Sequence, residues 1–497
     1  MSKKINVLEI GEEEWENMYD FSKVNFERSS SLTLEKDYQV IFFNQKIDEQ
    51  DLLTLRPSFP FYGTFILKDY EDYYKQFGDL LTKDQIQFID HDQLKDLIPE
   101  LHIRYVYGQN ASKFDVSMIR AHKSFRGKIE LKGNEYVLLD GFFGRDFKQL
   151  LYWQYGISIT NDHPIDLWLE YVKDENVQLQ LLIEEIEAGS VDHIVYEKTF
   201  SEQEMDQPIT IDHLPASGSL NFSLNAKGEG HLEIGTLHIR RSRYDTGIML
   251  PGGKRYANKK RQEFFYFYHG GDLKPPLNIY FSGYRTLEGF EGYHMMRSFG
   301  APFLLFSDPR LEGGAFYLGD DEFEGQILKI IDHYRSLLHF EWNEIIVSGL
   351  SMGAFGALYY GCQIHPHAII LGKPLVNLGT MADNETIFRP ESFPTSLGLL
   401  LSVEGGVAKD DARSLNQRIW EKVEQADLNG VKMPVAYMRN DDYDGKAFSM
   451  LVSQFSDQDV LIFGKGIEGR HNDETAAIVN WFVQQYEALL ADDFNRR

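Results

Sequence analysis

A serine between two glycines is the first feature of this sequence that could do chemistry. It lies in IIVSGLSMGAFGALYYG, residues 345–361, where Ser351 stands between Gly349 and Gly353. A G-x-S-x-G pattern between an apolar strand and a helix is typical of a nucleophile elbow, a strained turn that leaves no room for side chains at the two glycines. A serine attacks a carbonyl carbon when an imidazole removes its proton and a carboxylate orients that imidazole. The pattern therefore predicts an acid and a histidine further along the chain.

Three acids follow an apolar strand predicted over Val435–Met438. This is the position at which α/β-hydrolases place the acid of a catalytic triad, because loops at the carboxyl ends of parallel strands meet at one edge of the sheet. We predict that Asp441, the nearest to the strand end, orients the histidine. Asp442 and Asp444 can instead cap the helix that begins near Lys446.

A histidine follows the next apolar strand, predicted over Val460–Phe463. The intervening loop is rich in glycine and ends at His471, just before the last helix, so the chain order is Ser, acid, His. We predict that His471 is the general base for Ser351. The histidines beside the elbow helix, His365 and His367, are interpreted as surface or packing residues.

The oxyanion of such a reaction needs two backbone N–H donors. One is predicted at Met352, the residue after the nucleophile. The second is expected in a loop after an earlier strand, and two stretches compete: His269–Gly271, which has the lipase-like H-G-G pattern, and Ser282–Arg285. The first leads through two prolines into another strand, as a hairpin connection would, whereas the second leads into a helix. We therefore predict that Gly283 and Tyr284 provide the second donor.

Strands and helices alternate in the part of the chain that carries these residues, predicted as a domain over residues 262–497. Seven strands with helical segments between most of them favour an α/β-hydrolase sheet, and the glycine-rich residues 249–255 mark a boundary before it. The predicted strands are Phe264–Tyr268, Leu277–Phe281, Phe303–Phe306, Glu344–Val347, Ala368–Leu371, Val435–Met438 and Val460–Phe463.

The N-terminal part of the chain, residues 1–110, also alternates between apolar runs and polar segments that are compatible with helices. Its predicted strands, residues 38–43, 64–67 and 85–89, and its predicted helices, residues 71–82 and 91–98, indicate an α/β layer with a partly parallel sheet.

The middle of the chain, residues 127–245, has a period of two and indicates a β-sandwich. Its late stretch, with a bulge predicted at Gly235, resembles the last strands of jelly-roll carbohydrate-binding modules. Trp153 and Trp168 could stack on sugar rings if they are exposed. A structural spacer domain is the alternative interpretation.

Composition limits the classes of function. The chain of 497 residues has a formal net charge of −26, which disfavours binding to nucleic acid. No signal peptide and no apolar run long enough for a transmembrane segment is found, so we expect a cytoplasmic protein. The single cysteine, Cys362, excludes a multi-cysteine metal site, and no metal site is predicted.

A family resemblance rests on the elbow with its Ser, acid, His order, on the segment FSGYRTLEGFEGY at residues 281–293 and on the β-rich middle. Together they resemble the family of the second accessory Sec system protein of Gram-positive bacteria, over essentially the full length. The resemblance implies that the catalytic residues are Ser351, Asp441 and His471. It also implies an enzyme that O-acetylates N-acetylglucosamine on serine-rich repeat glycoprotein adhesins.

The resemblance further implies partners: two other accessory Sec proteins, the accessory Sec ATPase motor and the glycoprotein with its glycans, near a membrane-bound export machinery. The acyl donor is left open, because no P-loop or dinucleotide fingerprint is present and no cofactor is predicted. An esterase that removes acyl groups from glycans and a non-catalytic scaffold of the export complex are the alternatives.

Overall fold

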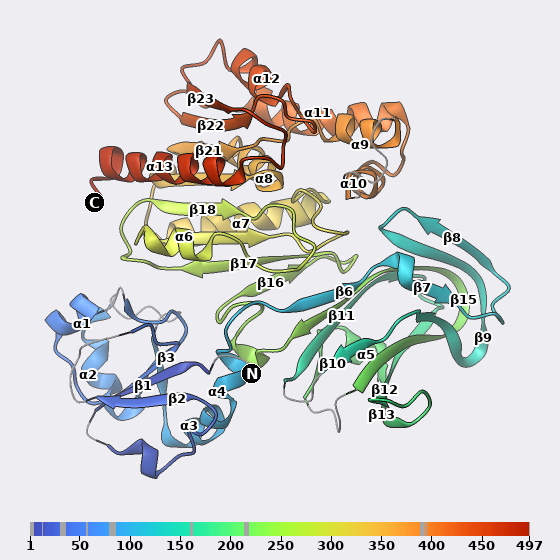
Figure 1. Ribbon diagram of the computed structural model, residues 1–497, viewed down its shortest axis with the longest axis horizontal. Helices are drawn as coiled ribbons and strands as arrows, with labels where there is room; N and C mark the ends of the chain where they lie inside the picture. Colours follow the sequence, from blue (N-terminus) through green and yellow to red (C-terminus); the bar gives the residue numbers. More distant parts are fainter. Residues whose placement is uncertain are drawn as a thin grey trace.

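The structure is a computed structural model that describes residues 4–11, 13–29, 36–55, 58–78, 86–159, 163–212, 218–387, 393 and 395–496. It has mixed α/β architecture with three hydrogen-bonded sheets. We call the parts that contain them the N-terminal region (residues 4–110), the β-rich region (residues 111–243) and the C-terminal region (residues 244–496). In Figure 1 the N-terminal region lies at the lower left, the β-rich region at the lower right and the C-terminal region above both.

The N-terminal region contains a five-stranded sheet in the order β2-β1-β3-β4-β5. Every pair in it is parallel, so the sheet is more regular than the partly parallel layer that the sequence predicts. Separate apolar clusters, centred on Phe42 and Phe43, cover its two faces because neighbouring strand residues point to opposite sides. The elements are β1 (Asn6–Gly11), β2 (Asn25–Ser29), β3 (Val40–Asn44), β4 (Thr64–Leu67), β5 (Ile86–Ile89), α1 (Glu49–Leu55), α2 (Glu71–Lys75), α3 (His91–Leu97) and α4 (Leu101–Arg104).

Two of the predicted N-terminal segments reach outside the described residues. The helix predicted over residues 71–82 begins at Glu71, and α2 ends at Lys75. Residues 79–85, which include the end of that predicted helix and the start of the predicted strand 85–89, lie outside the described part of the chain.

The strands of the β-rich region form one ten-stranded network, because β9 and β15 are long and pair with several others. The sequence predicts two packed sheets beginning near Gly127, whereas the first strand of this network begins at Ala111. Gly228, with φ of 104°, lies where the β9–β15 register shifts, so the strands bend there and enclose a core. The elements are β6 (Ala111–Phe114), β7 (Ile119–Ala121), β8 (Lys128–Lys132), β9 (Tyr136–Trp153), β10 (Ile157–Ile159), β11 (Ile165–Lys173), β12 (Gln178–Glu187), β13 (Ile194–Ser201), α5 (Glu202–Met205), β14 (Ile209–Ile211) and β15 (Gly218–Arg241).

Two details of this region bear on the sequence predictions. The predicted bulge is present, since Gly235 and Thr236 lie opposite Glu170 alone. The two tryptophans are not available to a sugar: Trp153 is 3% and Trp168 4% exposed. Trp153 packs in the core of the β-rich region, and Trp168 lies between guanidinium groups at its boundary with the C-terminal region. Their proposed role as exposed stacking platforms is therefore wrong.

The C-terminal region contains an eight-stranded sheet in the order β16-β17-β19-β18-β20-β21-β22-β23. Strand β17 pairs antiparallel with both of its neighbours, β16 and β19, and the remaining five pairs of the sheet are parallel. The sequence predicts seven of these eight strands. The strand that it misses, β16, begins within the glycine-rich stretch 249–255, which is interpreted as a boundary. The strands are β16 (Lys254–Ala257), β17 (Glu263–His269), β18 (Leu277–Phe281), β19 (Phe303–Ser307), β20 (Ile345–Leu350), β21 (Ala368–Gly372), β22 (Lys432–Met438) and β23 (Leu461–Ile467).

Helices connect most of these strands. Helix α8 packs against β18, β20 and β21, and α13 packs against β21 and β22. Helices α9, α10 and α11 pack on one another in the long connection between β21 and β22. The helices are α6 (Tyr293–Ser298), α7 (Asp321–Leu338), α8 (Met352–Gly361), α9 (Leu378–Ile387), α10 (Thr395–Glu404), α11 (Lys409–Gln425), α12 (Ala447–Gln454) and α13 (Thr475–Phe494).

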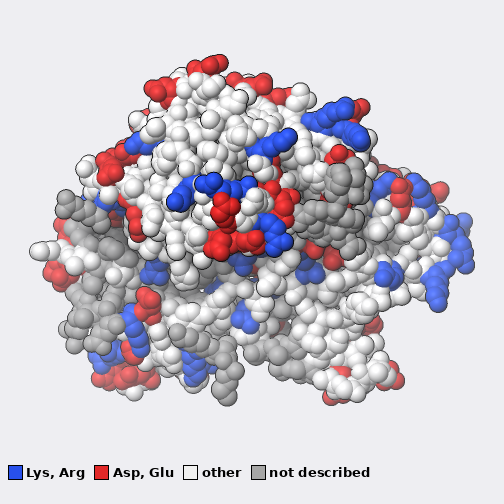
Figure 2. Space-filling view, turned by 45° about the horizontal axis from the view of Figure 1, so that its top comes forward, with Lys and Arg blue, Asp and Glu red and all other residues white. Residues whose placement is uncertain are grey.

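The surface seen in Figure 2 carries acidic and basic side chains interspersed, with Lys and Arg gathered at the right-hand rim. Among the residues that the structure describes, no helix combines the length and apolar content needed to cross a membrane.

Candidate active site

Ser351 lies in the turn between β20 and α8, as the sequence predicts. Its φ is 54° and its ψ −118°, a backbone conformation that side chains other than glycine rarely adopt. The two flanking glycines are required because a side chain at either position would clash with the backbone. A Cβ at Gly349 would lie 2.1 Å from the carbonyl oxygen of Gly353, and a Cβ at Gly353 would lie 2.0 Å from that of Phe281. The strained turn holds the serine at the carboxyl edge of the parallel strands.

The structure brings Ser351, His471 and Asp441 into one hydrogen-bonded chain. The distance from Ser351 Oγ to His471 Nε2 is 2.8 Å, and that from His471 Nδ1 to Asp441 Oδ2 is also 2.8 Å. His471 is 2% exposed, so its ring is held away from bulk solvent. This arrangement suits a base that takes a proton from the serine while the carboxylate fixes its tautomer.

Asp441 is held in its ionised form by its neighbours. Burial raises the pKa of a carboxyl group, but the hydrogen bond and charge of His471 and two backbone N–H groups outweigh it and lower the pKa of Asp441. Those N–H groups, of Tyr443 and Asp444, donate to Oδ1 at 2.9 and 3.1 Å. Asp441 therefore stays charged and acts as a hydrogen-bond acceptor.

The two neighbouring acids do not cap the following helix, the alternative that the sequence leaves open. Lys446, without a side-chain cap, precedes α12. Asp442 accepts the backbone N–H of His471 at 3.0 Å, which fixes the main chain of the histidine. Asp444 is buried and accepts the N–H groups of Val376 and Asn377, both at 2.8 Å. Burial raises the pKa of Asp444 more than these bonds lower it.

The loop after β18 carries the expected second oxyanion donor beside the elbow. The N–H of Gly283 is already engaged, because it donates to Glu291 Oε2 at 2.8 Å. No acceptor for the N–H groups of Tyr284 and Met352 is found within the described part of the chain. Because the Gly283 N–H is engaged by Glu291, Tyr284 is the remaining candidate for the second oxyanion donor beside Met352.

The competing H-G-G stretch lies at the other edge of the sheet. It connects the end of β17 to the start of β18, and β18 runs parallel to β20. Ser351 follows the end of β20, so His269–Gly271 lies at the opposite edge. The imidazole Nδ1 of His269 accepts the N–H of Gly271 at 3.0 Å, as in a local turn.

Two aromatic residues of this site, Phe393 and Tyr443, were not found from the sequence. Together with Tyr284, which was predicted only for its backbone N–H, they form a row of aromatic rings that ends on His471, with centroid distances of 5.2, 5.4 and 4.8 Å. The three rings come from distant connections, so no local motif points to the row. They give the site an apolar wall next to the imidazole.

Lys373 is a further residue that sequence reasoning missed. It follows β21 directly, it is 6% exposed, and its Nζ is 3.3 Å from Thr475 Oγ1. Burial lowers its pKa, while the charges of Asp441 and Glu291 act in the other direction. Its place after a parallel strand, at the edge where Ser351 lies, was the available signal.

A cavity of about 410 Å³ lies away from these residues, between the N-terminal region and residues 245–254. Tyr62, Tyr105, Arg104 and Lys254 are among its lining residues. In the described residues, no group of three or more His, Cys, Asp or Glu side chains is arranged to hold a metal ion.

The sequence profile of the family described as accessory Sec system GspB-transporter matches residues 3–496. The chain belongs to this accessory Sec family. An accessory Sec system protein of Staphylococcus aureus is 38% identical over 435 residues, which cover 88% of this chain and 83% of that protein. The Streptococcus gordonii protein of the same name is 37% identical over the full length of both chains.

A solved structure supports the fold of this accessory Sec chain over its whole length. It is a chain of the glycosylation associate protein complex from Streptococcus agalactiae, with a TM-score of 0.88 and 34% identity. The alignment covers 100% of both chains.

Proposed function

We propose that this accessory Sec protein is a serine acyltransferase of α/β-hydrolase type that transfers an acetyl group to a hydroxyl of N-acetylglucosamine. The observation that carries the proposal is the chain of two 2.8 Å hydrogen bonds from Ser351 through His471 to Asp441. The sheet order and the strained elbow after β20 support the hydrolase assignment.

In the first half of the proposed reaction, Ser351 Oγ attacks the carbonyl carbon of an acyl donor. His471 Nε2 accepts the serine proton, and the N–H groups of Met352 and Tyr284 stabilise the oxyanion. The bond between the acyl carbon and its leaving group breaks, and the leaving group takes the proton from His471. The product is an acyl ester of Ser351.

In the second half, His471 removes a proton from a sugar hydroxyl, and that oxygen attacks the ester. The bond to Ser351 breaks and the proton returns to its Oγ. Transfer to a sugar instead of hydrolysis requires that the acceptor displaces water from the site. The row of aromatic rings ending on His471 supports a site that excludes water and offers apolar faces to a sugar.

We also propose that the protein works in the export of serine-rich repeat glycoproteins, with two other accessory Sec proteins and the accessory Sec motor. Family membership and the relative solved as part of a complex support this role. The proposed domains are the N-terminal α/β region, the β-rich region and the C-terminal hydrolase region, with boundaries near residues 110 and 245.

An activated acetyl ester, with and without an N-acetylglucosamine-bearing glycopeptide, tests the enzyme proposal. We expect an acetyl adduct on Ser351 by mass spectrometry and faster loss of that adduct, with acetylated glycopeptide as product, when the acceptor is present. Release of acetate at the same rate with or without acceptor would identify an esterase. Absence of any adduct, with unchanged behaviour in Ser351→Ala, would leave the scaffold alternative.

A further inference from the structure

The loop that follows β18, residues 282–292, touches the nucleophile elbow at its beginning. A Cβ placed on Gly283 would lie 3.1 Å from the carbonyl oxygen of Leu350, the residue before Ser351. Tyr284, the proposed oxyanion donor, is the next residue of this loop. Any movement of the loop therefore changes the distance between the Tyr284 N–H and the reacting carbonyl.

The beginning and the end of the loop are tied together by a reciprocal pair of hydrogen bonds. Gly283 N–H donates to Glu291 Oε2 at 2.8 Å, and Glu291 N–H donates to Ser282 Oγ at 3.0 Å. As a result, the position of Tyr284 depends on where the residues before Glu291 are held.

The first contact from outside the C-terminal region comes from Gln109, which lies two residues before β6 begins. Its Oε1 accepts the N–H of Phe290 at 2.6 Å, and its Nε2 donates to the carbonyl of Phe290 at 2.9 Å. The amide also fills the space beside Gly289, where an added Cβ would lie 2.7 Å from Gln109 Oε1. One side chain thus satisfies both polar groups of a loop residue, as a neighbouring strand would.

The second contact from outside the C-terminal region comes from β15 of the β-rich region, which binds Glu288 of the loop. Glu288 is 3% exposed, and its carboxylate accepts hydrogen bonds from His238 Nδ1 and Arg240 Nε. Arg240 also donates to Glu263 of β17, so the same side chain joins the loop to the sheet. Buried charges that are paired on several sides resist displacement, because moving one leaves another without a partner.

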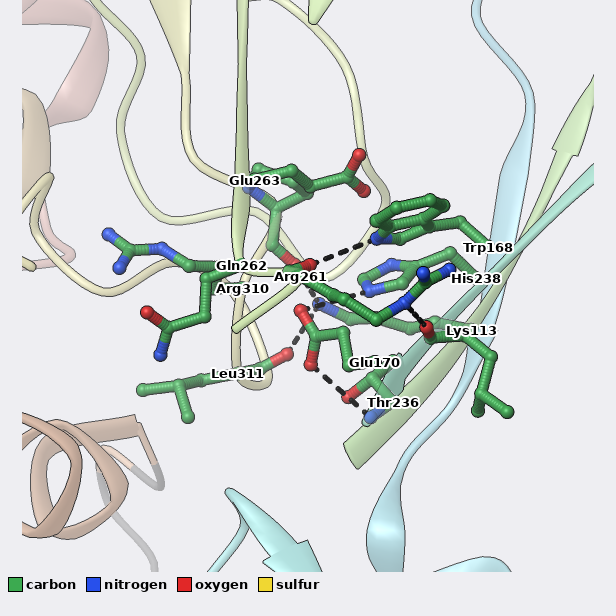
Figure 3. A network of polar contacts seen from close by, with 12 residues as sticks. Lys113, Trp168, Glu170, Thr236, His238, Arg261, Gln262, Glu263, Arg310 and Leu311 are labelled. Atoms are coloured by element: carbon green, nitrogen blue, oxygen red, sulfur yellow. Dashed lines mark hydrogen bonds and ion pairs between the residues drawn. The ribbon is translucent and has the colours of Figure 1, made fainter. Parts of the chain in front are cut away.

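Further contacts of the same buried network hold the neighbouring loop after β19 (Figure 3). Lys113 of β6 donates to the carbonyl groups of Pro309 and Leu311 at 3.1 and 2.7 Å. That loop in turn accepts the N–H of Arg285 at the carbonyl of Gly313. Both loops on the oxyanion side of Ser351 are therefore held by residues outside the C-terminal region.

We propose that Gln109 and Glu288 are positioning residues for the reaction at Ser351. They fix the far end of loop 282–292 so that Tyr284 N–H stays within hydrogen-bond distance of the oxyanion. The inference rests on the proposed acyl-transfer function. Oxyanion donors act at about 2.7–3.1 Å, and a displacement of about 1 Å can cost on the order of 10²-fold in rate.

Gln109→Ala tests the proposal, because Gln109 is partly exposed and its loss leaves no buried charge. We expect kcat for an activated acetyl ester to fall about 10- to 100-fold with KM changed less than about twofold. The rate at which a fluorophosphonate probe labels Ser351 should fall by a similar factor, since that step also builds charge on an oxygen in the oxyanion site. Gln109→Glu keeps the size but replaces the donor by an acceptor, and kcat should fall in it as well.

Thr246→Val is the matched control. It removes another hydrogen bond between regions, from Arg104 Nη1 to Thr246 Oγ1 at 3.0 Å, which does not involve loop 282–292. Its kcat should stay within about twofold of the parent, while thermal unfolding shows a loss of stability comparable to that of Gln109→Ala.

Parental kcat and labelling in folded Gln109→Ala and Gln109→Glu would overturn the proposal, as would an equal loss of kcat in Thr246→Val. Failure of the proposed function gives a different result. In that case the parent protein itself shows neither ester turnover nor labelling at Ser351, and the inference falls with it.

Discussion

At the scale of single residues, the imidazole of His471 has a defined partner on each side. A neutral ring that donates from Nδ1 to Asp441 must accept at Nε2, and Ser351 Oγ lies there. The N–H of His471 is also fixed by Asp442. Of the three acids that the sequence offers, only Asp441 bonds the ring, and the other two hold main chain.

The three acids should consequently differ when each is changed to its amide. Asp441→Asn should lower kcat by about 10⁴, because the amide favours the wrong tautomer of His471. Asp442→Asn keeps an acceptor for a backbone N–H and should cost less than about tenfold. Steady-state kinetics with an acetyl ester measures both, and a larger loss in Asp442→Asn would reassign the acid.

The elbow glycine Gly353 should tolerate no side chain. Gly353→Ala would place a Cβ 2.0 Å from the carbonyl of Phe281, so the strand or the elbow must move. We expect a loss of about 1–3 kcal/mol in unfolding free energy and loss of most activity. Gly325→Ala in α7 is the control, since an added Cβ there meets nothing within 4 Å. A Gly353→Ala protein with parental kcat and stability would contradict the steric argument.

At the scale of elements, β1 of the N-terminal sheet carries a buried carboxyl group that makes stability depend on pH. Glu9 is 0% exposed and accepts a hydrogen bond from Asn44, and its Oε2 has no hydrogen-bond partner among the residues that the structure describes. Burial raises the pKa of Glu9 to about 7. The folded state therefore keeps a proton that the unfolded state releases between its ordinary pKa and about 7.

This linkage predicts that the free energy of unfolding falls as pH rises from about 4.5 to about 7 and levels off above. Glu9→Gln should remove that part of the slope and stabilise the protein at pH 8 by on the order of 1–3 kcal/mol. Urea unfolding of both proteins at several pH values provides the measurement. The same slope in Glu9→Gln and parent would assign the pH dependence to other groups.

The elements that could be predicted from the sequence are those with strong local signals. Each of the seven apolar strands of the C-terminal region is present, because buried parallel strands read as continuous apolar runs. The strand β16 was missed since its residues, KRYA, are largely polar and follow two glycines. The single curved network of the β-rich region was also missed, because which strands pair across long β9 and β15 is not a local property.

The features of the candidate site also divide into those that have a local sequence signal and those that have none. Ser351, Asp441 and His471 follow strand ends in a fixed chain order, so they could be found locally. The engagement of Gly283 by Glu291 and the aromatic row over His471 arise from contacts between distant connections, which carry no spacing rule.

At the scale of the whole molecule, catalysis and assembly should be separable. Ser351→Ala removes one oxygen at an intermediate-exposure site and should leave any interface of about 800 Å² per partner intact. We expect the variant to co-purify with its accessory partners at parental stoichiometry, while the exported glycoprotein lacks acetyl groups. Loss of assembly in this variant would mean that the two roles are one.

Removal of the N-terminal region would be a poor test of the same point. Arg243 is 2% exposed, and its guanidinium donates to the carbonyl groups of Arg104, Val106 and Gly108. A deletion that ends at Gly108 would leave this buried cation without those acceptors and destabilise the fold. A point change at Ser351 avoids this complication.

The chain order of the site also sets when the site is completed during translation. Ser351 and His471 are 120 residues apart, which corresponds to about 6–24 s of synthesis at 5–20 residues per second. Gln109, His238 and Arg240, which hold loop 282–292, are made before the serine. The nascent chain thus contains the loop, the residues that hold it and the nucleophile before it contains the proposed base. Translation products that end before residue 471 should therefore be unable to acylate any nearby sugar.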